Sequence, residues 1–281
     1  MGRVEELENI ATQVRRDVIR MINLSQSGHP GGSLGCADLM TCLYFDILKY
    51  DPCDFDMDGK NQDVFFLSIG HIAPVWYSVL ARSGSFDIKE LKTLRKLDSK
   101  LQGHPSIQEK TEGVRIASGS LGQGLSVAAG AALAKKLNKD KSLVYSLHGD
   151  GEMQEGQIWE AATFAAHHKI DNLISVIDNN GKQIDGPVSE VMNLGNLKAK
   201  WEAFGWLVFE MDGNNIQDVL DTMKKAKDNT GNNKPIMIIM KTEMGMGVDF
   251  MMGTHKWHGA APTDEQTKLA LSQLPETLGD F

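Results

Sequence analysis

The second half of the chain alternates short apolar runs with helical patterns, and this alternation constrains the fold more than any other feature. Apolar runs of strand length occupy residues 143–147, 173–177, 206–211 and 236–241. Helical patterns separate them at residues 156–168, 194–204 and 215–228. Strands that alternate with helices pair in parallel, because each crossover returns through a helix on one face of the sheet. The sequence therefore predicts a three-layer α/β fold with a mostly parallel sheet, and we expect a single domain over residues 1–281.

The remainder of the chain is predicted to be helical around one further strand. Helical patterns fall at residues 4–25, 36–48, 73–82, 87–98 and 125–137. A short apolar run at 65–68 predicts a buried strand, and the Gly-rich segment 27–32 predicts a turn. The segment from about 243 to 281 begins rich in Gly, Met and His, which favours a functional loop region over a linker.

Composition and charge exclude two classes of function. The chain has 29 Lys and Arg against 37 Asp and Glu, which gives a net charge of −8 without a basic run, so no nucleic-acid partner is expected. No window approaches the roughly 18 apolar residues of a membrane span, and the N-terminus lacks the apolar core of a signal peptide. The three cysteines, Cys36, Cys42 and Cys53, match no zinc spacing and are interpreted as free thiols. We therefore expect a cytoplasmic protein with no membrane partner.

Polar residues follow two successive predicted strands, where ligands bind in parallel sheets. Gly149-Asp150-Gly151 ends one strand, and Asn179-Asn180 ends the next. One βαβ unit takes roughly 30 residues, so the two strand ends become neighbours in the sheet. A carboxylate and an amide oxygen suit Mg²⁺ or Ca²⁺, and glycine lets backbone N–H groups approach phosphate. Asp150 and Asn180 thus predict a metal-bound diphosphate site; the alternative is a pair of strand-end residues with no ligand role.

Four of the eight histidines lie beside glycine in predicted loops: His29, His71, His104 and His258. Imidazoles donate hydrogen bonds to hydroxyl groups and exchange protons near neutral pH, which suits a polyhydroxylated ligand. A single loop histidine is usually only exposed, but four in similar surroundings favour a catalytic site. The other four, at positions 148, 167, 168 and 255, are interpreted as structural.

Taken together, the motifs resemble those of the transketolase family. They are Ser27-Gly28-His29-Pro30-Gly31, Ser68-Ile69-Gly70-His71, Gly103-His104-Pro105, Gly119-Ser120-Leu121-Gly122-Gln123-Gly124 and His255-Lys256-Trp257-His258-Gly259, in the family's order. The resemblance runs from about residue 8 to about residue 262. It implies a thiamine-diphosphate-binding fold and reversible transfer of a two-carbon ketol unit from a ketose, or ketose phosphate, to an aldose, as in the pentose phosphate pathway.

The resemblance also implies roles for the residues that hold the cofactor. Asp150, the Asn180 side chain and the main-chain carbonyl of Lys182 match the ligands of Mg²⁺ or Ca²⁺, and the Gly151 N–H matches a diphosphate donor. The loop Gly119, Ser120 and Leu121 matches the one that packs on the aminopyrimidine ring. Two positions depart from the family: Lys182 stands where an apolar residue is usual, and Ser120 where proline is common. The lysine ammonium is expected to point away from the ion.

The family resemblance further assigns roles to the four histidines and to Glu155. His71 and His258 match cofactor contacts, and all four histidines match residues around cofactor and substrate. Those at 29 and 258 are the best candidates for proton transfer at sugar hydroxyls. Glu155 matches a residue at the subunit contact, although a glutamate that begins a helix is an equally good interpretation.

A partner subunit is implied because transketolases complete their site with a second domain. That domain supplies a glutamate to the cofactor and the arginines that grip sugar phosphate. We therefore expect an N-terminal subunit of a split transketolase, paired with a C-terminal subunit that carries the pyrimidine-binding domain, as α2β2. The alternatives are a truncated piece, a degenerate remnant, a 2-oxoacid dehydrogenase α subunit, a deoxyxylulose-phosphate synthase, or a non-catalytic thiamine-diphosphate binder.

Overall fold

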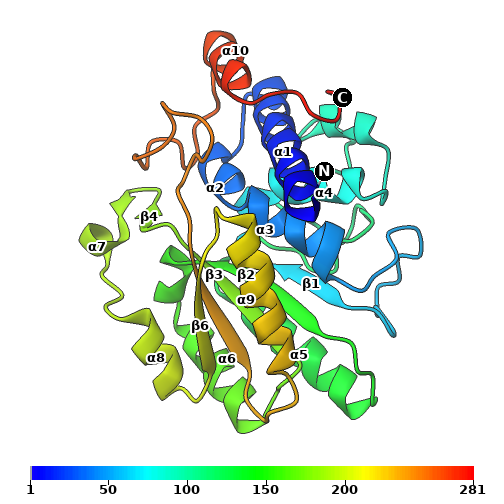
Figure 1. The fold of residues 1–281 in the computed structure, drawn as a ribbon, viewed down its shortest axis with the longest axis vertical. Coiled ribbons are helices and arrows are strands. Elements are labelled where there is room, and N and C mark those ends of the chain that lie inside the picture. The colour runs from blue at the N-terminus through cyan, green and yellow to red at the C-terminus, as the bar shows by residue number, and fades with distance from the viewer. Residues whose placement is uncertain (1) are drawn as a thin grey trace.

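Five parallel strands form the central sheet of the chain, which a computed structural model describes from residue 2 to residue 281 (Figure 1). The strands are β1 (Val64–Leu67), β2 (Val144–Gly149), β3 (Leu173–Asn179), β6 (Leu207–Asp212) and β7 (Ile236–Lys241). Their order is β1-β2-β3-β7-β6, and every neighbouring pair is parallel. The chain leaves β3 for the edge strand β6 and returns to β7, so the strand order reverses beside β3. The predicted parallel sheet is confirmed.

Two hydrophobic layers cover the sheet, because successive side chains of a strand face opposite sides. In β1, Phe65 and Leu67 pack into one layer, whereas Val64 and Phe66 pack into the other. The first layer includes helices α1 (Arg3–Ser25), α3 (Ala37–Cys42), α4 (Ala73–Arg82) and α9 (Ile216–Asp228). The second includes α5 (Gln123–Leu137), α6 (Gly156–His167) and α8 (Leu197–Ala203). This is the three-layer architecture that the alternation predicted.

The segment from residue 30 to 47 differs from the predicted turn and single helix. It forms α2 (Pro30–Gly35), α3 and a π-helical turn over Leu43–Ile47. Glycine permits this compact arrangement: a Cβ on Gly35 would lie 3.0 Å from the carbonyl oxygen of Glu243. Close packing of α2 on the segment after β7 therefore depends on small residues.

The predicted helix at 87–98 is also shorter than expected, since only a 3₁₀ helix over Ile88–Thr93 forms. Arg95 has a φ of 60°, which interrupts regular helix. Its guanidinium donates to Ser27 Oγ at 3.2 Å and to the Gly103 carbonyl at 3.3 Å. The left-handed backbone conformation of Arg95, which the helical pattern did not predict, thus occurs together with contacts to Ser27 and Gly103.

Several further elements were not predicted. A small hairpin pairs β4 (Lys182–Gln183) with β5 (Gly186–Pro187), and α7 (Val188–Val191) follows it. Short 3₁₀ helices follow β1 and β2, at Gly70–Ile72 and Gly151–Gln154. Within the expected loop region of the tail lies α10 (Asp264–Gln273), where Thr263 and Gln266 form a capping box. None of the helices within residues 2–281 combines the length and apolar character needed to cross a bilayer.

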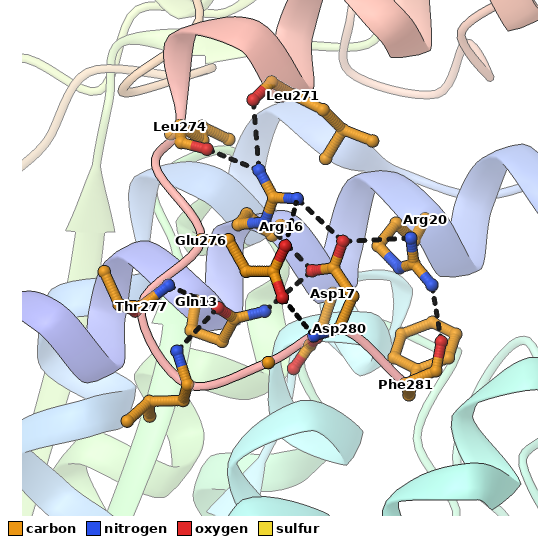
Figure 2. Close-up of polar contacts among 12 residues, drawn as sticks. Gln13, Arg16, Asp17, Arg20, Leu271, Leu274, Glu276, Thr277, Asp280 and Phe281 are labelled. Atoms are coloured by element: carbon orange, nitrogen blue, oxygen red, sulfur yellow. Dashed lines mark hydrogen bonds and ion pairs between the residues drawn. The ribbon is translucent and has the colours of Figure 1, made fainter.

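Helix α1 anchors the residues that follow α10 (Figure 2). Arg16 donates to both carboxylate oxygens of Asp280, at 2.9 and 2.7 Å, and to the carbonyls of Leu271 and Leu274 at 3.0 and 2.5 Å. Gln13 adds a bond to Asp280 at 2.9 Å. Because α10 follows the segment that carries His258, this anchor holds one end of that segment against the rest of the chain.

We predict that Arg16→Ala lowers the free energy of unfolding by about 3 kcal/mol, because two carbonyls lose their bonds from Arg16 and the half-buried Asp280 carboxylate keeps only its bonds from Gln13 and Arg20. Arg3→Ala on the same helix is the matched control: Arg3 pairs with Glu6 and Asp46, but its side chain is 41% exposed. The control should lose less than about 1 kcal/mol. Chemical denaturation measures both, and equal losses would contradict the anchoring role of Arg16.

Candidate active site

A cavity of about 360 Å³ lies at the carboxyl ends of β1, β2 and β3. Most of the predicted site residues line it: His29, His71, His104, Gly119, Leu121, Asp150, Gly151, Asn180, Lys182 and His258. Ser120 does not line it, although both of its neighbours in the loop do. A larger hollow of about 700 Å³, between the amino end of β1 and the end of α5, contains none of these residues. The chemistry-bearing residues therefore converge at one place in the fold.

The register of the sheet brings the turns after β2 and β3 together. Gly149 pairs with Asp178 across these strands, so each turn begins at the same height. Asp150 then accepts hydrogen bonds from Gly151 N at 2.7 Å and from Gly181 N at 2.6 Å. Asn180, one residue before Gly181, lines the same cavity. The turns that carry Asp150 and Asn180 thus meet, as the spacing of the two motifs predicted.

The hydrogen bonds of Asn180 orient its amide in this turn. Its Nδ2 donates to Asp178 Oδ2 at 2.8 Å, and its Oδ1 accepts from Lys182 N at 2.9 Å. A carbonyl or carboxylate oxygen has two lone pairs, so one backbone bond leaves capacity for a further ligand. Asp150 and Asn180 therefore retain oxygen lone pairs that a cation could use.

Two buried carboxylates lie close together in this corner of the cavity. Asp150 is 3% exposed, and burial followed by repulsion from Asp178 raises its pKa to about 7. Asp178 is 2% exposed, and burial raises its pKa despite hydrogen bonds from Thr242 and Asn180. A divalent cation would favour both ionised forms. Within residues 2–281 no group of three or more His, Cys, Asp or Glu side chains could hold a metal, so such a cation needs other oxygen ligands.

Lys182 lies at the rim of the same cavity. Its Nζ donates to Glu243 Oε1 at 3.0 Å, and Glu243 also accepts from Gly253 N at 2.9 Å. The lysine ammonium is thus engaged by the segment after β7, and its direction relative to an ion beside Asp150 stays a prediction.

Three of the four Gly-flanked histidines pack against one another in the wall of the cavity. Ring centroids lie 5.1 Å apart for His29 and His71, 5.0 Å for His71 and His258, and 5.6 Å for His29 and His258. His104 is 6.2 Å from His29. Backbone contacts support this geometry: Gly31 N donates to the Trp257 carbonyl at 3.0 Å. A Cβ on Gly31 would lie 2.9 Å from that oxygen, so a side chain there would separate the two segments.

Burial keeps these four imidazoles neutral near pH 7. It lowers the pKa of His29 to about 4, with further repulsion from His258, and it brings the pKa of His71 well below its usual value. The pKa values of His104 and His258 are also lowered, mainly by burial. The Nδ1 atoms of His29 and His258 are buried and have no hydrogen-bond partner within residues 2–281. Neutral imidazoles can donate from one nitrogen and accept at the other, as proton transfer to hydroxyls requires.

The structure adds cavity residues that the sequence analysis missed. Glu152, Asp178, Gln154, Ile184 and Met244 all line the cavity. Asp178 could have been found from its position directly before the Asn pair, at the end of an apolar strand. Glu152 directly follows Gly149-Asp150-Gly151, and that adjacency is the one sequence signal it offers. Glu155 lines the cavity too and precedes α6 as its N-cap residue, without a capping bond from its side chain.

Comparison with known proteins places the chain in a family. Residues 7–276 match the protein-family model described as transketolase, thiamine diphosphate binding domain. An apulose-4-phosphate transketolase subunit of Phocaeicola vulgatus is 39% identical over 98% of this chain and 96% of that protein. A 6-deoxy-6-sulfo-D-fructose transketolase subunit of Clostridium sp. is 38% identical over 96% of each. Human transketolase is 35% identical over 92% of this chain, which spans 40% of its length.

Solved structures agree with this assignment. The crystal structure of transketolase from Campylobacter jejuni superposes with a TM-score of 0.89 at 35% identity, over 97% of this chain and 43% of that one. A transketolase structure from Leishmania mexicana gives a TM-score of 0.87 at 29% identity. The family model, the relatives and the structures coincide over nearly the whole chain. The protein therefore belongs to the transketolase family and comprises its N-terminal, thiamine-diphosphate-binding domain.

Proposed function

We propose that this chain is the N-terminal subunit of a two-subunit transketolase, which transfers a two-carbon ketol unit between sugars with thiamine diphosphate and a divalent metal, Mg²⁺ or Ca²⁺. The observation that carries the proposal is the convergence, in one cavity, of Asp150, Asn180 and the four histidines. Under this proposal the chain itself contributes a corner for the metal and diphosphate and a cluster of neutral imidazoles.

The cavity residues fit a metal-bound diphosphate. Asp150 and Asp178 are buried close together, and the side-chain oxygens of Asp150 and Asn180 keep lone pairs for a further ligand. With the Lys182 carbonyl they would hold the ion, and the Gly151 N–H would donate to the diphosphate. The loop Gly119, Ser120 and Leu121 would lie along the aminopyrimidine ring through its backbone.

The histidines fit the sugar end of the reaction. When bound, thiamine diphosphate supplies the carbon chemistry that breaks and forms the carbon–carbon bond. The chain's own part is to orient hydroxyl groups and move protons. His29 and His258 carry the roles of proton acceptor and donor at sugar hydroxyls, since both are neutral and have a buried Nδ1 with no hydrogen-bond partner among the described residues. His71 and His104 bind and orient cofactor and substrate beside them.

A partner subunit completes this site. Among the described residues that line the cavity, Lys182 is the one lysine or arginine, and Glu243 already engages it. Cationic side chains of another polypeptide would therefore bind the sugar phosphate. We assign them to a C-terminal subunit with a pyrimidine-binding domain, in an α2β2 assembly. Relatives named as transketolase subunits support a divided enzyme, and their names include both a phosphorylated and a sulfonated sugar. The substrate class is thus a ketose donor, usually anionic, and an aldose acceptor.

An assay of the two co-expressed subunits tests the proposal. With Mg²⁺ and thiamine diphosphate, the complex should convert a ketose phosphate and an aldose phosphate into products whose chain lengths differ by two carbons. Mass spectrometry of reactions with a ¹³C-labelled donor identifies the transferred fragment. Cofactor-dependent turnover of pyruvate, with no transfer from any ketose in a panel of phosphorylated and sulfonated donors, would instead indicate a 2-oxoacid enzyme.

A further inference from the structure

Glu152 lines the cavity and contacts three separate loops. It belongs to the 3₁₀ helix after β2 and is 2% exposed. Its Oε1 accepts from Gly122 N at 2.7 Å and from the Ser68 hydroxyl, and its Oε2 accepts from Gly149 N at 3.1 Å. Ser68 in turn accepts from Gly124 N at 3.1 Å. One carboxylate therefore joins the ends of β1 and β2 to the start of α5.

Each of the three loops carries a different part of the candidate site. Ser68 precedes the turn with His71, Gly122 follows the Gly119–Leu121 loop, and Gly149 begins the turn with Asp150. The packing at this junction is close: a Cβ on Gly124 would lie 2.4 Å from Ser68 Cβ. The junction therefore links the three loops through direct contacts.

Both oxygens of the Glu152 carboxylate face hydrogen-bond donors. His148 is fully buried, its Nδ1 lies 3.5 Å from Oε2, and its Nε2 contacts Ser146 Oγ at 2.8 Å. An ionised carboxylate accepts at both oxygens, which the surrounding donors require.

We propose that Glu152 is a positioning residue that fixes the diphosphate turn, the aminopyrimidine loop and the His71 turn relative to one another before the cofactor binds. The inference rests on the proposed function, because the ligand that spans these loops is thiamine diphosphate. The Glu152 junction would preorganise the three loops for thiamine diphosphate. Without it, cofactor binding must also order the loops, so the affinity for the cofactor falls.

The test compares Glu152→Gln with Asp63→Asn in the complex with the partner subunit. A glutamine amide has one acceptor oxygen and presents an NH₂ group to backbone N–H donors, so at least one of Gly122 and Gly149 loses its acceptor. The dissociation constant for thiamine diphosphate with Mg²⁺, measured by titration calorimetry, should rise about 10- to 100-fold. At saturating cofactor, kcat should change less than about threefold, because the reacting groups remain.

Asp63 is the matched control because it is also a buried carboxylate that receives backbone N–H bonds. It is 4% exposed and accepts from Leu143 N at 2.8 Å and Lys49 N at 3.0 Å, at the amino ends of the strands. Asp63→Asn should lower the melting temperature as Glu152→Gln does and leave cofactor affinity unchanged. Equal weakening by the two variants, or unchanged affinity in a folded Glu152→Gln complex, would overturn the proposal.

Ser68→Ala keeps the question answerable if Glu152→Gln fails to fold. It removes one contact to Glu152 and the acceptor for Gly124 N, and cofactor affinity should fall about 3- to 10-fold; unchanged affinity would overturn the inference. An unsubstituted complex that binds no thiamine diphosphate would overturn the proposed function and this inference together. If the unsubstituted complex binds thiamine diphosphate and transfers ketol units, and Glu152→Gln binds the cofactor with the same affinity, only the inference about Glu152 would be overturned.

Discussion

Replacing Asp150 with alanine should abolish metal-dependent binding of thiamine diphosphate. Asp150 is the one carboxylate of the proposed ion site. It lies where the turns after β2 and β3 meet, and it accepts hydrogen bonds from Gly151 N and Gly181 N. Without it, the ion would keep one amide oxygen and one carbonyl from the protein, and the diphosphate would face Asp178 unshielded. We expect the cofactor dissociation constant to rise by roughly 100-fold or more, and Mg²⁺ to lose its effect on binding.

Titration calorimetry in Mg²⁺ and in EDTA measures this effect directly. Asp185→Ala is the matched control, since Asp185 is an exposed carboxylate in the neighbouring β4–β5 hairpin. It removes the same charge a few residues from the site but no proposed ligand, and its affinity should stay within about twofold of the unsubstituted complex. Unchanged cofactor affinity in Asp150→Ala would show that the metal site is assigned to the wrong residues.

The second large effect concerns the partner. The purified chain, given Mg²⁺, thiamine diphosphate and sugar substrates, should show no ketol transfer, and addition of the C-terminal subunit should raise turnover at least roughly 100-fold. The physical reason lies in the cavity, where the described lining residues include no arginine and one lysine, already engaged by Glu243. Under the proposed function, the partner subunit would supply the glutamate and the anion-binding groups that the family resemblance implies.

A coupled assay across increasing partner concentrations measures this dependence, and sedimentation velocity reports the size of the assembly. Turnover should saturate at equal concentrations of the two subunits if the assembly is α2β2. The Asp150→Ala variant is a useful control here, because it should assemble with the partner yet remain inactive. Full activity of the chain by itself would contradict the proposal of a divided enzyme.

Most of the fold could be predicted because its signals are local. Apolar runs of strand length, separated by helical patterns, predicted β2, β3, β6 and β7, and Gly-rich punctuation marked the strand ends where ligands bind. Local signals failed where distant contacts set the backbone. Arg95 leaves the helical region beside Ser27 and Gly103, which no local pattern around it encodes. Helix α10 had a local signal, the capping box at Thr263 and Gln266, but the surrounding loop composition concealed it.

The sequence alone determined the parallel sheet, the two strand-end motifs and the identity of most residues around the cavity. These features depend on hydrophobic periodicity and turn-forming residues, which act over a few neighbouring positions. Only the tertiary structure decided how those residues meet. Three features join segments that are separated in the sequence. They are the packing of His29 against His258, the burial of Asp150 beside Asp178, and the junction at Glu152. Their separations and pKa values arise from burial and from contacts that exist only once the sheet and its covering layers have assembled.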